Sequence, residues 1–178
     1  LESGFHVDEQ HALEIALGLS KEEIMSAINE RRRLLVAVRG AAAELHLGRL
    51  LRAERSISRV IDLDEDGEPD FEVDYRGRAF RIECKNTLRR LQRGVPKVDF
   101  QKTRGSISDP CSRYYKPEQF EILAACLHPV TDKWEFRFCT TRVIPAHPKC
   151  PGHLSQHVLV ANGGWTGSVT EALDSVAR

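Results

Sequence analysis

The sequence predicts an α/β domain preceded by a helical arm. Up to about residue 52, apolar side chains recur at helical spacing. Residues 69–85 instead alternate polar and apolar side chains around Arg76-Gly77, a pattern typical of an antiparallel hairpin. A mostly apolar run at 119–127 and an alternating run at 134–141 have the length of further strands. Helices therefore come first, and a sheet follows.

The first helices are assigned to an arm at residues 1–38, ahead of a domain at 39–178. Residues 8–18 have helical spacing, and the capping box Ser20-Lys21-Glu22-Glu23 begins a second helix. The apolar stripe of that second helix consists of Ile24, Ile28, Leu35 and Val38. Arg31-Arg32-Arg33 interrupts it, either as a solvated face or as a contact for phosphates.

Gly40 is expected to separate a third helix, from Ala41 to about Arg52. Its predicted apolar stripe consists of Ala41, Leu45, Gly48 and Leu51. Glu44 lies beside this stripe and needs a partner, for which a salt bridge to Arg49 or Arg52 is the simplest choice. A first strand is expected over Ser56 to Leu63.

In the hairpin, the alternation predicts which residues face each other. Phe71, Val73, Phe80 and Ile82 form the core side. On the other side Glu72 faces Arg81, and Asp70 faces Glu83. Carboxylates placed directly opposite, with Cβ atoms about 5 Å apart, repel each other. A positive group is therefore expected between Asp70 and Glu83.

A divalent cation meets that requirement, because Mg²⁺ binds carboxylate oxygens and keeps several waters. Lys85 lies two residues beyond Glu83 on the same side of the strand, where it would orient or help deprotonate an attacking water. The alternative is an exposed hairpin face that carries these charges by chance.

The residues Pro69-Asp70 and Glu83-Cys84-Lys85 resemble the motif of the PD-(D/E)xK nuclease superfamily. The resemblance covers about residues 40–142 and implies a restriction-endonuclease-like mixed central sheet flanked by helices. It also implies that Asp70, Glu83 and the backbone carbonyl of Cys84 bind Mg²⁺, for which Mn²⁺ would substitute, and that Lys85 is catalytic. Two further residues match less specific parts of the pattern: Glu44 on the first core helix, and Gln101 in the loop and helix after the lysine.

Basic residues are concentrated after the hairpin. From Lys85 to Lys116 there are nine basic residues and two acids, the distribution expected where a phosphate backbone approaches, although an ordinary surface would also carry it. The candidates for DNA contacts are Arg89, Arg93, Lys102, Arg104 and Arg113. Arg113 is the candidate for reading a base, with Tyr114 and Tyr115 beside it as stacking partners.

Farther along the chain, His147, Cys150, His153 and His157 lie close enough in sequence to suggest zinc, but their order matches no common zinc finger. A late strand is expected over His157 to Ala161, and Ser168 is expected to cap a final helix. Three other cysteines, Cys84, Cys126 and Cys139, lie in apolar runs and most resemble core residues.

Composition narrows the function classes. The 26 basic and 26 acidic residues give no net charge, which argues against a histone-like binder. Five cysteines without a CxxC pair fit a reducing cytoplasm, and no apolar run is long enough for a membrane helix. The chain opens without methionine, so a further domain outside it is an open expectation.

The resemblance implies a Mg²⁺-dependent endonuclease that hydrolyses phosphodiester bonds of DNA, with double-stranded DNA as its partner. A junction or repair nuclease, or an RNase, would share the same core. A DNA-binding module without catalysis is the alternative from another class, and a homodimer is left open.

Overall fold

The computed structural model describes residues 10–63, 65, 67–102, 105–161 and 163–177. Two compact units make up the chain, Leu1–Arg39 and Gly40–Arg178. The helices are α1 (Ala12–Leu17), α2 (Lys21–Glu30), α3 (Arg32–Ala53), α4 (His128–Thr131) and α5 (Val169–Ala177), with 3₁₀ turns η1 (Pro110–Arg113) and η2 (Thr141–Val143). The strands are β1 (Ile57–Asp62), β2 (Phe71–Tyr75), β3 (Arg78–Asn86), β4 (Lys97–Asp99), β5 (Ile122–Cys126), β6 (Phe136–Thr140) and β7 (His157–Leu159).

The predicted capping box at the start of α2 is confirmed. The Ser20 hydroxyl accepts a hydrogen bond from the Glu23 amide at 3.2 Å, and the Glu23 carboxylate accepts one from the Ser20 amide at 2.8 Å. Two otherwise unpaired backbone donors are satisfied in this way. Neither α1 nor α2, all of whose residues are described, contains a buried residue.

The predicted break at Gly40 is wrong, because α3 runs without interruption from Arg32 to Ala53. The break between helices lies instead at Arg31, between α2 and α3, where the backbone is extended (φ −102°, ψ 103°). Glycine within a helix costs only about 1 kcal/mol relative to alanine. The three alanines that follow Gly40 are the strongest helix formers and offset that cost.

The buried stripe of α3 also differs from the predicted one. Ala41 and Leu45 are exposed, and the buried residues are Ala43, Leu47, Gly48 and Leu51. Both sets have helical spacing, because this helix carries apolar residues around much of its circumference. Packing against the sheet therefore selects the buried side, as at Gly48, where an added Cβ would lie 3.2 Å from the Phe71 ring.

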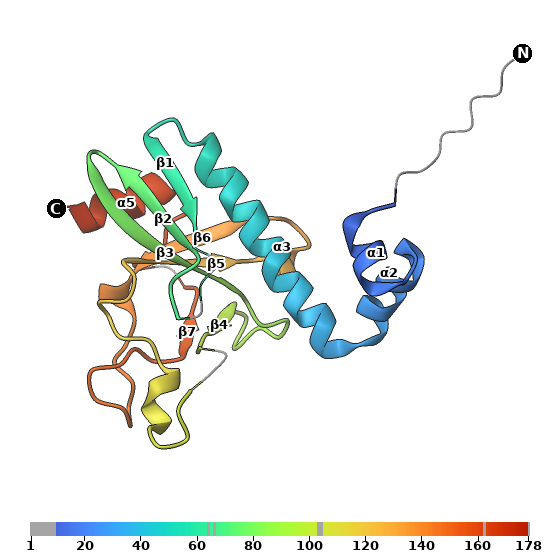
Figure 1. Ribbon diagram of the computed structural model, residues 1–178. Coiled ribbons are helices and arrows are strands. Elements are labelled where there is room, and N and C mark those ends of the chain that lie inside the picture. The colour runs from blue at the N-terminus through green and yellow to red at the C-terminus, as the bar shows by residue number, and fades with distance from the viewer. Residues whose placement is uncertain (1–9, 64, 66, 103–104, 162, 178) are drawn as a thin grey trace, which may run out of the picture. The chain divides into compact units, whose positions relative to one another are not determined.

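The central sheet has five strands in the order β1-β2-β3-β5-β6 (Figure 1). It is mixed as predicted, since β3 and β5 are parallel and the other neighbours are antiparallel. The hairpin register is confirmed, with Phe71 opposite Ile82 and Glu72 opposite Arg81. Arg76 and Gly77 both have positive φ (49° and 75°), the conformation that a tight turn between twisted strands requires.

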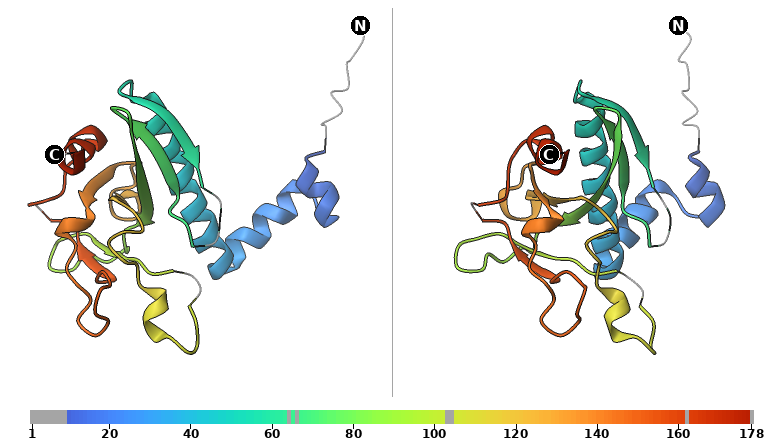
Figure 2. Two further views of the ribbon diagram at one scale, coloured as in Figure 1. Left: turned by 60° about the vertical axis from the view of Figure 1, so that its left-hand side comes forward. Right: turned by 90° about the vertical axis from the view of Figure 1, so that its left-hand side faces the viewer.

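Alternate residues of β3 divide the sheet into two faces. We call the side of Phe80, Ile82 and Cys84 the helix face, because their cluster includes buried residues of α3 and α5. Both views in Figure 2 show α3 running beside the strands. The side of Glu83 is the loop face, and it is covered mainly by irregular chain that contributes Phe100, Tyr115 and Leu154 to a second cluster.

The cover of the loop face contains a small antiparallel sheet of β4 and β7, which is a second sheet, distinct in its strand pairing from the central one (Figure 1). Between β3 and β4 the chain forms a narrow hairpin, in which Leu88 N donates to Lys97 O at 2.8 Å and Gln92 N donates to Val95 O at 2.8 Å. We call residues 87–98 the basic hairpin. The helix expected after the lysine is represented only by the short turn η1.

Two other expectations concern the ends of the sheet region. The late strand is present as β7, although it pairs with β4 and is not part of the central sheet. Ser168 caps α5 as predicted, since its hydroxyl accepts a hydrogen bond from the Glu171 amide at 3.3 Å.

Among the described residues, no helix has both the length and the apolar character needed to cross a membrane.

Candidate active site

Asp70 and Glu83 come together where β2 begins and β3 approaches its end. Asp70 lies one residue before β2, so it is outside the paired ladder. Its Oδ2 instead accepts a hydrogen bond from the Cys84 amide at 2.7 Å. This bond ties the aspartate to the strand that carries Glu83, which agrees with the predicted proximity of the two carboxylates.

Lys85 contacts both carboxylates, between which a divalent cation was expected. Its Nζ forms an ion pair with Glu83 Oε1 and lies 3.7 Å from Asp70 Oδ2. The side chains of Asp70 and Lys85 are 22% and 26% exposed, whereas that of Glu83 is 1% exposed. The site therefore reaches solvent through Asp70 and Lys85, and Glu83 forms its floor.

Tyr115 completes the surroundings of Glu83. Its buried hydroxyl donates a hydrogen bond to Glu83 Oε1 at 2.6 Å. Lys85 contacts the same oxygen, and the other oxygen, Oε2, is buried without a hydrogen-bond partner among the described residues. Buried polar atoms are rarely left unpaired, so Oε2 is available to a water, an ion or another ligand.

The charges of the site act on one another. Burial raises the pKa of Glu83, with Lys85 opposing the rise and Asp70 adding to it. Burial lowers the pKa of Lys85, but the negative charges of Glu83 and Asp70 outweigh that effect and raise it overall. Burial and the Glu83 charge also raise the pKa of Tyr115. At neutral pH Lys85 is therefore an ammonium and Tyr115 is a hydrogen-bond donor.

The residues fit a hard divalent cation. The described residues contain no cluster of three or more His, Cys, Asp or Glu side chains suited to a metal ion. Mg²⁺ does not need such a cluster, because it is commonly held by one or two carboxylates together with waters and substrate phosphates. The Oε2 atom of Glu83, which has no hydrogen-bond partner among the described residues, supports this fit, and the Asp70 carboxylate lies 3.7 Å from the same Lys85 ammonium. The Cys84 carbonyl as a third ligand stays a prediction.

Glu44 approaches from the opposite side of β3. Burial raises the pKa of the Cys84 thiol well above its usual value, and the negative charges of Asp70 and Glu44 contribute to that rise. Since the Cys84 side chain belongs to the helix face, Glu44 lies near the site but across the strand from Glu83. Arg52, one of the salt-bridge partners considered for Glu44, forms an ion pair with Asp62.

Gln101 lies in residues 100–102, which cover Tyr115 and which we call the covering segment. The preceding residue, Phe100, stacks on the Tyr115 ring with centroids 5.6 Å apart. The following residue, Lys102, places Nζ 5.5 Å from the centroid of the same ring. Half-buried Gln101 is thus held between two neighbours of Tyr115, and its supporting role stays a prediction.

The predicted DNA-contacting residues occupy three places around this site. Arg89 and Arg93 are exposed on the basic hairpin, and Arg93 lies at its tip with a positive φ of 53°. Lys102 lies over Tyr115, and Arg113 is exposed at the end of η1. Arg104 falls outside the described residues.

The predicted support of Arg113 by two stacking tyrosines is wrong. Tyr114 stacks on His147, with ring centroids 4.0 Å apart, and Tyr115 is buried beneath the covering segment, where it contacts Glu83. Sequence reasoning missed this role of Tyr115. One signal was available in the sequence. Tyr115 lies near other aromatic residues typical of a core, and a buried tyrosine hydroxyl needs a hydrogen-bond partner.

The suggested zinc cluster is also not formed by the described residues. Cys150 is joined to Cys111 in a disulfide, and His147 stacks on Tyr114. The expectation of reduced cysteines therefore fails for this pair, whose members are separated by 39 positions in the sequence. Cys84, Cys126 and Cys139 are free and buried, as predicted.

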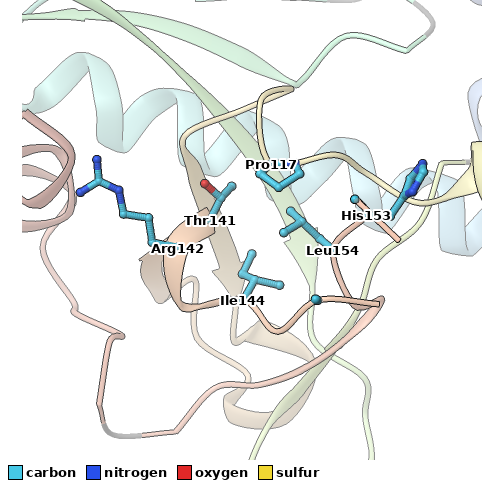
Figure 3. Close-up of a pocket in the computed structure, with 8 residues that line it drawn as sticks. Pro117, Thr141, Arg142, Ile144, His153 and Leu154 are labelled. Atoms are coloured by element: carbon cyan, nitrogen blue, oxygen red, sulfur yellow. The ribbon is translucent and has the colours of Figure 1, made fainter. Parts of the chain in front are cut away.

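A shallow pocket of about 300 Å³ lies elsewhere on the surface (Figure 3). Pro117, Thr141, Ile144 and Leu154 are among its lining residues, and Asp70, Glu83 and Lys85 are not. Its wall lacks paired carboxylates. The candidate chemistry thus resides at the open end of the β2–β3 pair and not in this pocket.

Comparison with known proteins supports the fold. No family model and no curated protein matches the sequence. A solved structure, that of the bacterial homing endonuclease I-Ssp6803I, is similar with a TM-score of 0.50 and 15% sequence identity. The match covers 71% of this chain and 78% of that one. The predicted restriction-endonuclease-like fold is thereby confirmed.

Proposed function

We propose that this chain is a Mg²⁺-dependent endonuclease that hydrolyses phosphodiester bonds of DNA. The observation that carries the proposal is the group formed by Asp70, Glu83 and Lys85, in which a buried carboxylate oxygen has no hydrogen-bond partner in the part of the chain that the structure describes. The similarity to a homing endonuclease supports the same class of reaction. A module that only binds DNA has no evident use for a buried carboxylate held beside a second one.

In this proposal Asp70 and Glu83 hold the cation, and Mn²⁺ substitutes for Mg²⁺. The bound cation would supply positive charge to the scissile phosphate and lower the pKa of an attacking water. Lys85 orients that water and offsets the negative charge that develops on the phosphate.

The basic residues around the site are proposed to hold the DNA backbone. Arg89 and Arg93 are exposed on the basic hairpin, Lys102 lies over the Tyr115 ring, and Arg113 ends η1, where its carbonyl accepts a hydrogen bond from the Lys102 amide at 2.8 Å. Contacts to phosphates supply affinity without reading sequence, so these residues would position the duplex over Lys85. Glu44 and Gln101 would support the site from either side of β3.

The test is cleavage of supercoiled plasmid by the wild-type chain and by the variant Glu83→Gln, in Mg²⁺, in Mn²⁺ and in EDTA. Wild-type chain should nick the plasmid only when the cation is present, and Glu83→Gln should lose that activity. Glu121→Gln is the matched control, since Glu121 forms a half-buried ion pair with Arg81 at 3.1 Å outside the site. It should cleave normally.

Other outcomes would decide between the alternatives. Cleavage that persists in EDTA, or at full rate in Glu83→Gln, would end the metal-nuclease proposal. Binding of duplex DNA without cleavage by the wild-type chain would favour the non-catalytic module. Duplex and single-stranded RNA tested alongside the plasmid separate a DNase from an RNase.

A further inference from the structure

We infer that Tyr115 is a positioning residue, whose hydroxyl holds the Glu83 carboxylate in the orientation that leaves Oε2 available to a divalent cation. The inference rests on the proposed function, because it concerns the same carboxylate. It adds a role for a residue that lies outside the motif formed by Asp70, Glu83 and Lys85.

The hydrogen bonds around Glu83 are distributed unequally between its two oxygens. Oε1 accepts from the Tyr115 hydroxyl at 2.6 Å and also pairs with Lys85, whereas Oε2 is buried without a hydrogen-bond partner among the described residues. A carboxylate free to rotate would share its contacts between both oxygens. Fixing Oε1 from one side therefore determines where Oε2 points.

Of the two partners of Oε1, Tyr115 is held more rigidly. Its ring packs against Phe100 and Phe120, with centroids 5.6 and 5.4 Å away, and its carbonyl accepts a hydrogen bond from the Leu154 amide at 2.8 Å. Lys85 reaches the carboxylate on a flexible aliphatic stem and is partly exposed to solvent. A residue whose ring and backbone are fixed is better able to orient a metal-binding carboxylate.

The chain offers a matched comparison on the opposite face of the sheet. Tyr75 is also buried, and its hydroxyl donates a hydrogen bond to a carboxylate oxygen of Asp174 at 2.7 Å. The ring of Tyr75 belongs to the helix-face cluster, away from Glu83. The substitutions Tyr115→Phe and Tyr75→Phe therefore remove the same chemical group from bonds of similar length, but only the first acts on the proposed ligand.

The experiment measures Mn²⁺ affinity of the full chain by electron paramagnetic resonance, without DNA and without turnover. Tyr115→Phe should weaken Mn²⁺ binding by about 10- to 100-fold, the range found when a group that orients a metal ligand is removed. Tyr75→Phe should bind Mn²⁺ as the wild type does. All variants are compared at a temperature at which circular dichroism shows each of them folded, so that lost stability is not mistaken for lost affinity.

The outcomes distinguish this inference from its premise. Wild-type affinity in Tyr115→Phe, together with lost affinity in Glu83→Gln, would overturn the role of Tyr115 and leave the proposed function standing. Equal losses in Tyr115→Phe and Tyr75→Phe would also overturn it, since the effect would then be structural. Absence of Mn²⁺ binding by the wild-type chain would overturn the proposed function and the inference together.

Discussion

The two faces of the central sheet are built from alternate residues of the same strands, yet they are covered in different ways. On the helix face, Ile82 and Cys84 pack in an apolar cluster with residues of α3 and α5. On the loop face, the neighbouring Glu83 is buried beneath irregular chain and bonds to Tyr115. Adjacent residues of β3 therefore differ in role: Ile82 and Cys84 pack in the core, whereas Glu83 belongs to the candidate active site.

The difference shows how a scaffold and a site share one strand. Helices cover a sheet with continuous apolar surface, which stabilises the fold and leaves little room for polar groups. Irregular chain can bring a hydroxyl, an ammonium or an amide to a defined point. Substitutions of the apolar residues on the helix face should therefore change stability, whereas substitutions of the polar site residues on the loop face should change metal binding and cleavage.

The largest effect is expected from Lys85→Met, which removes the ammonium and keeps the length of the side chain. Plasmid cleavage should fall by about 100- to 1,000-fold, because positive charge near the scissile phosphate is lost. Affinity for DNA, measured by filter binding, should change little. Lys85→Arg should restore little activity, since the guanidinium is planar and larger. Near-normal cleavage by Lys85→Met would make Lys102 the next candidate.

Ile82→Ala is the counterpart on the helix face, one residue away from Glu83. Ile82 is fully buried, so its truncation should lower the free energy of unfolding by about 2–5 kcal/mol. Urea unfolding measures this change. Mn²⁺ affinity and cleavage per folded molecule should match the wild type, and a folded variant that fails to bind Mn²⁺ would show that the two faces are not independent.

Removal of the Cys111–Cys150 disulfide should weaken the loop face selectively. Cys111→Ser is expected to cost about 2–4 kcal/mol of stability, because the bridge restricts the unfolded chain. Amide hydrogen exchange should accelerate more around Tyr115, which lies between the two bridged positions, than in the buried part of α3 at Leu47. Equal acceleration at both places would contradict the distinction, and added dithiothreitol should have no further effect on this variant.

The smallest effect concerns the basic hairpin, whose residues would contact phosphates. Arg89→Ala or Arg93→Ala should each weaken binding of unrelated DNA sequences to a similar extent and reduce the salt dependence by about one unit in the log–log slope. Arg59→Ala is the control, since Arg59 is exposed on β1 and lies 3.7 Å from Asp74. Unchanged slopes in the hairpin variants would place the DNA contacts elsewhere.

Sequence reasoning succeeded where the interactions are local. The register of β2 and β3 follows from the period-two alternation and the Arg76-Gly77 turn, so the core residues and the proximity of Asp70 to Glu83 were predictable. It failed at Gly40, because glycine is only about 1 kcal/mol less favourable than alanine in a helix, and the three alanines that follow favour the helix. The wrong stripe on α3 has a related cause, since apolar residues at helical spacing occupy more than one side of that helix.

The sequence by itself determined the alternation of β3, and hence that Glu83 and Lys85 share a side opposite the apolar core, because side-chain direction in a strand is set by the backbone of that strand. The tertiary structure alone decided what meets Glu83 there. Tyr115 lies 32 residues away along the chain, and its hydroxyl reaches the carboxylate only after the covering segment has folded back over the sheet. Contacts of that kind depend on the packing of distant segments, and no local pattern in the sequence encodes them.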